Sequence, residues 1–182
     1  MLIRTSFSFF CAMASDMPRT AVEIGVNEGH NAVSMLVSYP KLTLYAVDHY
    51  KDMFLVWDGS DEFPEERKQL HKDKAFKILN TFNNNGNKRC HIVYKSSMEA
   101  VNDFPDNHFD YIYIDGDHRY EAVKDDLEKW YPKLKIGGVF AGHDFVAECE
   151  GVVLAVQEFY NKRNLKYIIG NDGDFWHVKE WL

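Results

Sequence analysis

Hydrophobic and polar positions along this 182-residue chain follow two alternating patterns. Short apolar runs are typical of buried strands, and longer segments with apolar residues three or four apart are typical of helices. Strands are expected at 20–26 ("TAVEIGV"), 42–48 ("LTLYAVD"), 89–97 ("RCHIVYKSS"), 109–115 ("FDYIYID") and 137–145 ("GGVFAGHDF"). Helices are expected at 30–40, 120–134 and 150–164. The apolar face of the second helix consists of Ala122, Val123, Leu127, Trp130 and Leu134.

Strands that alternate with helices predict βαβ units and therefore an α/β fold with a mostly parallel, Rossmann-like sheet and helices on both faces. The segment 166–181 reads as two strands around an "NDGD" turn, which makes the last strand antiparallel. We expect one domain over 1–182, with an N-terminal helical segment at 1–19.

Residues 50–76 break this order, because their middle is polar and their signals are mixed. An insertion of this length after a strand is often a lid or a substrate loop. Phe54, Leu55 and Trp57 are the side chains expected to close over a ligand. An ordinary surface helix is the alternative interpretation of this segment.

Composition and charge narrow the classes of partner. Apolar residues make up 46% of the chain, charged residues 27%, and the net charge is −7. Without a Lys/Arg block, neither a nucleic-acid partner nor an anionic membrane is expected. No apolar run approaches the roughly 18 residues of a membrane span. Cys11, Cys90 and Cys149 lie far apart, which favours reduced thiols in a cytoplasmic protein.

The first predicted strand leads into a glycine-containing turn. In open α/β sheets, ligands bind outside the carboxyl ends of the strands. "VEIGVNEGHNA" places Gly25 and Gly29 there, with Glu23 inside the strand. Asn27 stands where the dinucleotide fingerprint has its second glycine, so a single carboxylate fits this turn better than a pyrophosphate. A plain βα turn is the alternative.

The next two strands end in polar side chains. Asp48 follows Gly25 by 23 residues, a position from which an acidic side chain holds ribose hydroxyls in nucleotide-binding folds. Ser96, Ser97 and Met98 follow the third strand and suit an adenine ring. The alternatives are a solvated turn for Asp48 and a helix N-cap for the serines.

The fourth and fifth strands deliver five ionisable groups. Asp115, Asp117 and His118 emerge on one turn, and His143 and Asp144 follow the next strand. Adjacent parallel strands would bring the two sets together. Carboxylates with imidazoles suit a divalent cation and equally suit a general base. A hydrogen-bonded polar cluster is the alternative, although such a concentration of charge is unusual for structure alone.

Several of these stretches together resemble class I S-adenosylmethionine-dependent methyltransferases. The motifs are "VEIGVNEGHNA", "YAVD", "SSMEA", "YIYIDGDHRYEAVKDDLEKWYPKLKIGGVFAGHDF" and "GVVLAVQEFY". The bacterial and phage branch with the I-D-G-D-H…G-H-D pattern is similar to the most specific part, Tyr111 to Phe145. The resemblance covers the chain from about Thr20 to its end. It implies a seven-stranded sheet with an antiparallel last strand.

The resemblance also implies roles for residues. Cofactor-binding positions would be Glu23, Gly25, Asn27 and Gly29 at the methionine end, Asp48 at the ribose, Ser97 and Met98 at the adenine, and Asp115. In related cation-dependent O-methyltransferases of the catechol type, the metal-binding positions fall on Asp115, His143 and Asp144, and a basic lysine falls on His118. Because His143 replaces an Asp of that family, a metal-free site with His118 or His143 as base, supported by Asp115, is preferred.

The sequence therefore predicts a methyltransferase that uses S-adenosylmethionine, with O-methylation of a small molecule or sugar as the first choice. A nicotinamide-dependent oxidoreductase is one alternative, which Asn27 and the lack of a Tyr-x-x-x-Lys pair argue against. A non-catalytic binding domain on the same scaffold is another. Residues 50–76 and the N-terminal segment would set the small-molecule acceptor. A homo-oligomer is compatible with the sequence.

Overall fold

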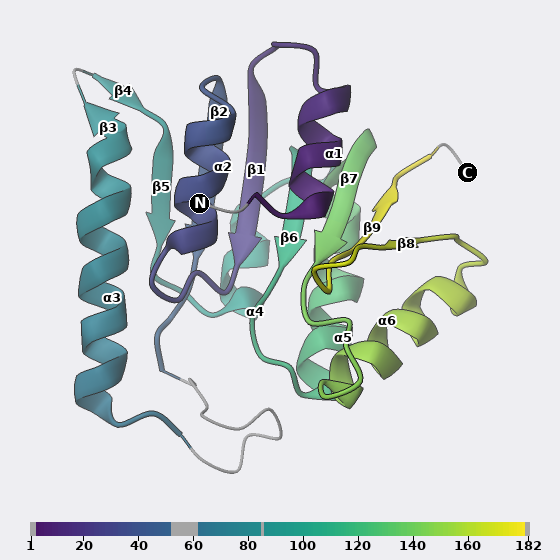
Figure 1. The fold of residues 1–182 in the computed structure, drawn as a ribbon. Coiled ribbons are helices and arrows are strands. Elements are labelled where there is room, and N and C mark those ends of the chain that lie inside the picture. Colours follow the sequence, from purple (N-terminus) through teal and green to yellow (C-terminus); the bar gives the residue numbers. More distant parts are fainter. Residues whose placement is uncertain (1–2, 52–61, 85, 181–182) are drawn as a thin grey trace.

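A seven-stranded sheet in the order β5-β2-β1-β6-β7-β9-β8 forms the centre of the computed structural model, which describes residues 3–51, 62–84 and 86–180 (Figure 1). The first five strands in this order are parallel, and β9 is antiparallel to both of its neighbours. The predicted fold, with its antiparallel last strand, is confirmed. The strands are β1 (Arg19–Ile24), β2 (Leu42–Val47), β5 (Cys90–Val93), β6 (Phe109–Ile114), β7 (Leu134–Gly142), β8 (Ile168–Ile169) and β9 (Phe175–Val178).

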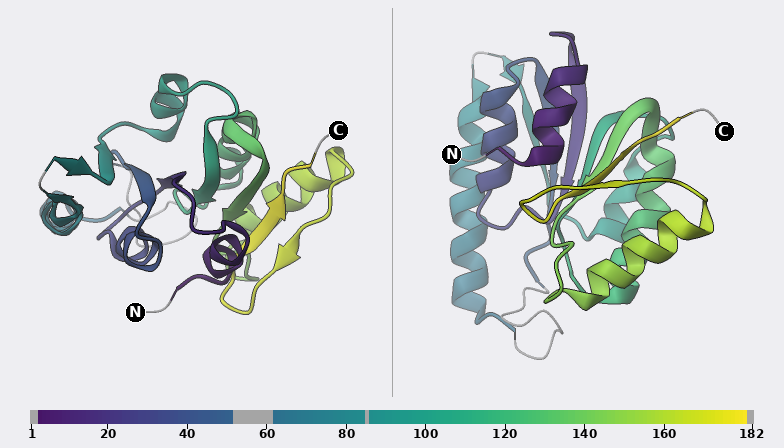
Figure 2. Two further views of the ribbon diagram at one scale, coloured as in Figure 1. Left: turned by 90° about the horizontal axis from the view of Figure 1, so that it is seen from above. Right: turned by 45° about the vertical axis from the view of Figure 1, so that its right-hand side comes forward.

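Helices cover both faces of the sheet, as the two views of Figure 2 show. The core on one face contains residues of α1 (Thr5–Met13), α2 (His30–Ser38) and α3 (Glu65–Leu79). The core on the other contains residues of α4 (Ser97–Ala100), α5 (Tyr120–Trp130) and α6 (Glu150–Lys162). All six residues of β6 are buried, because this central strand is covered on both sides.

Two boundaries differ from the sequence prediction. The apolar pattern extended the second predicted helix to Leu134, but α5 ends at Trp130. A short 3-10 turn with Pro132 follows, and Leu134 begins β7, three residues before the predicted start at Gly137. Proline at 132 explains the early end, since proline cannot continue a helix. A small hairpin, β3 (Asn83–Asn84) with β4 (Asn87–Lys88), was not predicted.

The segment 50–76 contains the start of an ordinary helix. The helix α3 spans Glu65–Leu79 and packs Ala75 and Leu79 into the core, so the second half of the segment is the crossover between β2 and β5. Phe54, Leu55 and Trp57 lie outside the described residues, and the lid stays a prediction.

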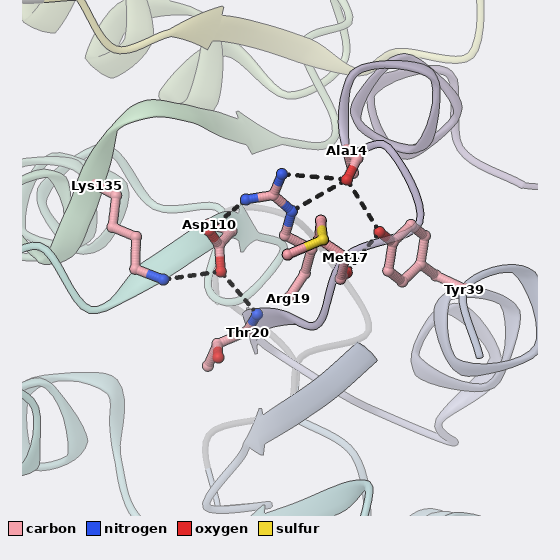
Figure 3. A network of polar contacts seen from close by, with 7 residues as sticks. All are labelled: Ala14, Met17, Arg19, Thr20, Tyr39, Asp110 and Lys135. Atoms are coloured by element: carbon pink, nitrogen blue, oxygen red, sulfur yellow. Dashed lines mark hydrogen bonds and ion pairs between the residues drawn. The ribbon is translucent and has the colours of Figure 1, made fainter. Parts of the chain in front are cut away.

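The N-terminal helix α1 is anchored at the amino end of the sheet (Figure 3). The guanidinium of Arg19 donates to the carbonyl of Ala14 and to Asp110 at the start of β6. The Tyr39 hydroxyl donates to the carbonyls of Ala14 and Met17. These contacts fix the chain that connects the end of α1 to the start of β1.

Among the described residues, no helix has the length and apolar content needed to cross a bilayer. Cys11, Cys90 and Cys149 are all free thiols.

Candidate active site

A cleft of about 770 Å³ lies at the carboxyl ends of the parallel strands. This volume is within the range of about 300–1,000 Å³ that is typical of small-molecule sites. Every strand end that the sequence marked as polar contributes to its lining. The lining includes Glu23, Gly25, Asn27, Asp48, Ser97, Met98, Asp115, Asp117, His118, His143 and Asp144.

Gly25 is required by the approach of two strand ends. Its φ is +85°, a conformation that favours glycine, and a Cβ atom there would lie 2.0 Å from the carbonyl oxygen of Asp115. The turns after β1 and β6 therefore touch through backbone atoms. Gly29, with φ of +84°, stands at the N-cap of α2 and is not among the residues that line the cleft.

Glu23 is a buried carboxyl group at the centre of the cleft. Asn31 donates to its Oε1 over 2.8 Å, while its Oε2 has no hydrogen-bond partner among the described residues. Burial raises the pKa of Glu23 well above its usual range, and the charges of Asp115 and Asp48 raise it further. An unsatisfied buried oxygen is costly, so this position suits a ligand that completes its hydrogen bonds.

Asp48 shapes the glycine turn. Its Oδ2 accepts from the backbone N–H groups of Val26 (2.9 Å) and Asn27 (3.0 Å), and its Oδ1 accepts from that of Tyr50 (2.7 Å). A carboxylate offers about four acceptor positions, so capacity remains for a ribose hydroxyl. The predicted ribose contact stays a prediction, and the structure adds a positioning role that sequence reasoning did not identify.

Helix α3 supports the same turn from the other side. Asn27, with φ of +51°, bonds through its side-chain oxygen to Nδ1 of His71, which is buried on α3. His71 was not predicted, because its partner comes from a distant turn.

A hydrogen-bonded chain lies at the Ser97 end of the cleft. The indole of Trp130 donates to the Ser97 hydroxyl over 2.8 Å, and that hydroxyl donates to Asp126. Burial raises the pKa of Asp126 to about 7. Ser96 is the N-cap of α4 in a capping box with Glu99, so the alternative interpretation of the serines is correct for Ser96.

Three groups of the predicted acid–imidazole cluster meet closely. Suitable ligand atoms of Asp115, His118 and Asp144 all lie within 4.8 Å of one another. His118 Nε2 is 2.9 Å from one carboxylate oxygen of Asp144, and His143 Nδ1 is 3.0 Å from the other. Burial acts to raise the pKa of Asp144, but its hydrogen bonds with the two imidazoles hold it well below the usual range.

Asp115 is the poorly compensated member of the cluster. Among the described residues, the nearest basic nitrogen, His143 Nδ1, is 3.7 Å from Asp115 Oδ1, which is beyond hydrogen-bond range. Burial raises the pKa of Asp115 to about 7, and the charge of Asp144 adds to this effect. A carboxyl group in this state can take up a proton near neutral pH.

His143, predicted as a metal ligand, lies between several protein groups, and its metal role stays a prediction. Its Nδ1 faces Asp144, while its Nε2 lies 2.5 Å from the Arg4 guanidinium and 2.9 Å from the Asp172 carbonyl oxygen. Both nitrogens are thus engaged by protein groups. In the part of the chain that the structure describes, the nitrogen that joins Asp115 and Asp144 in a metal-sized group belongs to His118.

Asp117 diverges from the cluster, because its carboxylate pairs with the Arg119 guanidinium and accepts from the Arg119 backbone N–H. Sequence reasoning missed Arg4 and Asp126, which both line the cleft. The sequence did carry a signal for Asp126, since it lies three residues after Val123 and four before Trp130 on the buried face of α5. Arg4 had no such local signal.

The sequence of this chain matches a family model and a relative. A family model described as a methyltransferase domain matches residues 22–145, which is more than half of the chain. An uncharacterized protein, y4gI of Sinorhizobium fredii, is 27% identical over 129 residues. The match covers 70% of this chain but only 13% of that protein.

Solved structures of methyltransferases share the fold. The O-methyltransferase NovP superposes with a TM-score of 0.69 at 18% identity, covering 97% of this chain and 78% of NovP. The calicheamicin methyltransferase CalS11 gives 0.69 at 17% identity, with 95% and 77% covered. The O-methyltransferase from Bacillus cereus in complex with SAH gives 0.65 at 16% identity, with 98% and 83% covered.

Proposed function

This chain belongs to the methyltransferase domain family, and from that membership we propose that it transfers the methyl group of S-adenosylmethionine to a hydroxyl group of a small molecule or sugar. The observation that carries the proposal is the cleft itself. It combines the glycine turn, the acidic side chains Glu23 and Asp48, and an acid–imidazole cluster at one end. O-methyltransferases such as NovP share the fold.

The residues of the cleft fit this cofactor. The unpartnered oxygen of Glu23 and the turn at Gly25 suit the methionine end. Asp48 has acceptor capacity for the ribose, and Ser97, Met98 and Asp126 suit the adenine. The sulfonium of the bound cofactor supplies an electrophilic methyl group. The protein then mainly has to align the acceptor oxygen with it and to remove a proton.

We propose that His118 is the base, with Asp144 fixing its orientation over 2.9 Å. Imidazole titrates near neutral pH and is suited to accept a hydroxyl proton. His143 has both nitrogens directed at protein groups, so it is better placed to hold Asp144 than to receive a proton.

A divalent cation held by Asp115, His118 and Asp144 is the competing arrangement. Two oxygens and one imidazole nitrogen favour manganese, iron or zinc over magnesium. A cation would orient the acceptor hydroxyl and lower its pKa. Loss of transfer in EDTA, restored by one of these ions, would establish the metal site, whereas transfer that survives EDTA but disappears in His118→Ala would establish the base.

The experiment that tests the function combines binding and transfer. Calorimetry should show that the protein binds S-adenosylhomocysteine, and incubation with methyl-labelled S-adenosylmethionine and a panel of hydroxylated compounds should label at least one of them. Binding of NAD in place of S-adenosylhomocysteine would support an oxidoreductase instead. Absence of both binding and transfer would leave a scaffold without catalysis.

The remaining expectations are part of the same proposal: a small-molecule acceptor, no nucleic-acid partner, and a cytoplasmic location in keeping with the three free thiols.

A further inference from the structure

Arg4 places a guanidinium at the end of the cleft where β7 ends, although it belongs to the N-terminal helix. It lines the cleft together with Asp115 and His143. Among the described residues, the one hydrogen bond of its guanidinium joins Nη1 to Nε2 of His143 over 2.5 Å. No carboxylate oxygen in the described part of the chain lies within ion-pair distance of it.

The contact with His143 does not satisfy Arg4 independently of other groups. Nε2 of His143 also lies 2.9 Å from the carbonyl oxygen of Asp172, which is a permanent acceptor. One ring nitrogen cannot donate to this carbonyl and accept from a guanidinium at the same time. Whenever Nε2 carries a proton, the described residues offer Arg4 no acceptor, and they offer the remaining donors of its planar group none in either state.

The backbone that carries Arg4 is held by a buried network. Thr5 N–H donates to Asp172 Oδ2 over 2.8 Å, and Ser6 donates to Asp174 through both its N–H (3.0 Å) and its hydroxyl (2.5 Å). Asp174 is fully buried and also accepts from the Tyr113 hydroxyl. The two aspartates of the β8–β9 turn thus cap α1, so Arg4 is positioned in advance at the cleft.

A guanidinium on a fixed backbone and with unused donors matches a carboxylate, which it can bind in a bidentate way. We infer that Arg4 is an anion-binding residue of the cleft and that its ligand is the carboxylate of a bound molecule. The inference rests on the proposed function and goes beyond it by naming the ligand chemistry. The carboxylate comes from one of two sources, an acidic acceptor or the methionine end of the cofactor.

The test uses two pairs of probes that differ in their carboxylate. One pair is S-adenosylhomocysteine and 5′-methylthioadenosine, which lacks the amino-acid end. The other is 3,4-dihydroxybenzoate and 3,4-dihydroxybenzamide. Calorimetry compares the wild type with Arg4→Gln and Arg4→Lys. Arg163→Gln is the matched control, because Arg163 pairs with Glu128 at the end of α6 and does not line the cleft. Thermal melts establish that each variant is folded.

Removing the guanidinium should lower the affinity for the carboxylate probe by about 10- to 100-fold. Weaker binding of S-adenosylhomocysteine alone assigns the carboxylate to the cofactor, and weaker binding of the benzoate alone assigns it to the acceptor. Arg4→Lys should retain part of the affinity. The inference is overturned if folded Arg4→Gln binds both carboxylates as Arg163→Gln does. The proposed function fails separately, if the wild type binds neither adenosine compound. In that case the benzoate pair still tests the role of Arg4.

Discussion

An aspartate lies near each end of strand β6, and the two differ in the hydrogen bonds that the protein gives them. Asp110, at its start, accepts hydrogen bonds from Arg19 (3.2 Å), Thr20 N–H (2.8 Å) and Lys135 (2.9 Å) (Figure 3). Among the described residues, no group donates a hydrogen bond to the carboxylate of Asp115, just after its end, and burial raises its pKa to about 7. The Asp110 side chain is the less exposed of the two, at 10% against 20% for Asp115, so exposure does not explain why Asp115 is the one without partners. What distinguishes them is whether the protein itself supplies their partners, and the aspartate without partners is the one in the cleft.

The strongest way to break this comparison is to exchange each carboxylate for its amide. Asp115→Asn should lower methyl transfer by about 100- to 10,000-fold, because it removes a group that can exchange a proton or hold a cation beside the acceptor. Asp110→Asn should leave the transfer rate of the folded protein close to that of the wild type. Initial rates at saturating cofactor measure both. A larger loss of transfer in Asp110→Asn than in Asp115→Asn would show that Asp115 is not the functional carboxylate of the two.

The comparison extends to Asp126, which accepts one hydrogen bond from the described residues, that of Ser97, and whose pKa burial raises to about 7. In the unfolded chain this group ionises near pH 4. Between about pH 4 and 7 the folded protein therefore binds the extra proton, and its stability falls as the pH rises through this window. Asp126→Asn cannot ionise, so relative to the wild type it should gain about 3 kcal/mol between pH 5 and pH 8.

Urea unfolding of the ligand-free protein at the two pH values measures this gain. Glu121→Gln is the control, since Glu121 is an exposed carboxylate in the first turn of the same helix, α5. Its difference from the wild type should be the same at both pH values. If Asp126→Asn behaves like this control, Asp126 does not carry the extra proton in the folded protein, and its likeness to Asp115 is wrong.

At the amino end of the sheet, the expected effect is on stability. Asp110→Ala leaves the N–H of Thr20, Arg19 and Lys135 without their shared acceptor. We expect the free energy of unfolding to fall by about 2 kcal/mol. This figure is reduced because Arg19 and Lys135 are partly exposed, so that solvent screens their ion pairs with Asp110. Asp115→Ala should cost less than this at pH 8, because it removes an uncompensated charge. Urea unfolding of both variants would contradict the comparison if Asp115→Ala were the more destabilised.

The sequence predicted the sheet and the cluster for a local reason. Apolar runs set the strands, and residues just after parallel strands share one edge, so a cluster of five side chains could be predicted there: Asp115, Asp117, His118, His143 and Asp144. Of these five, Asp115, His118 and Asp144 form the metal-sized group in the described part of the chain. The end of α5 was mispredicted because Leu134 continues its apolar spacing in the next strand. The sequence could not predict that Arg4 lines the cleft. Its position depends on hydrogen bonds from the start of α1 to Asp172 and Asp174, which are more than 160 residues away in the chain. Such contacts leave no periodic pattern.

Asp48 is a sharper test of the comparison, because it has protein partners as Asp110 does and also lines the cleft as Asp115 does. Like Asp110 it accepts several protein hydrogen bonds, from the N–H groups of Val26, Asn27 and Tyr50, and like Asp115 it lines the cleft. Asp48→Asn keeps one carbonyl oxygen and loses the charge that strengthens bonds to ribose hydroxyls. Affinity for S-adenosylhomocysteine should therefore fall by about tenfold, or about 1.4 kcal/mol. Asp48→Ala also frees the glycine turn and should cost up to about a hundredfold.

The matched measurement for Asp48 is calorimetry with adenosine and 2′,3′-dideoxyadenosine. If the carboxylate binds the ribose, the wild type should prefer adenosine, and Asp48→Asn should lose that preference while still binding the dideoxy compound as the wild type does. If the carboxylate only shapes the turn, both compounds should weaken equally in the variant. The second result would place Asp48 with Asp110, as a carboxylate whose partners are already supplied by the protein.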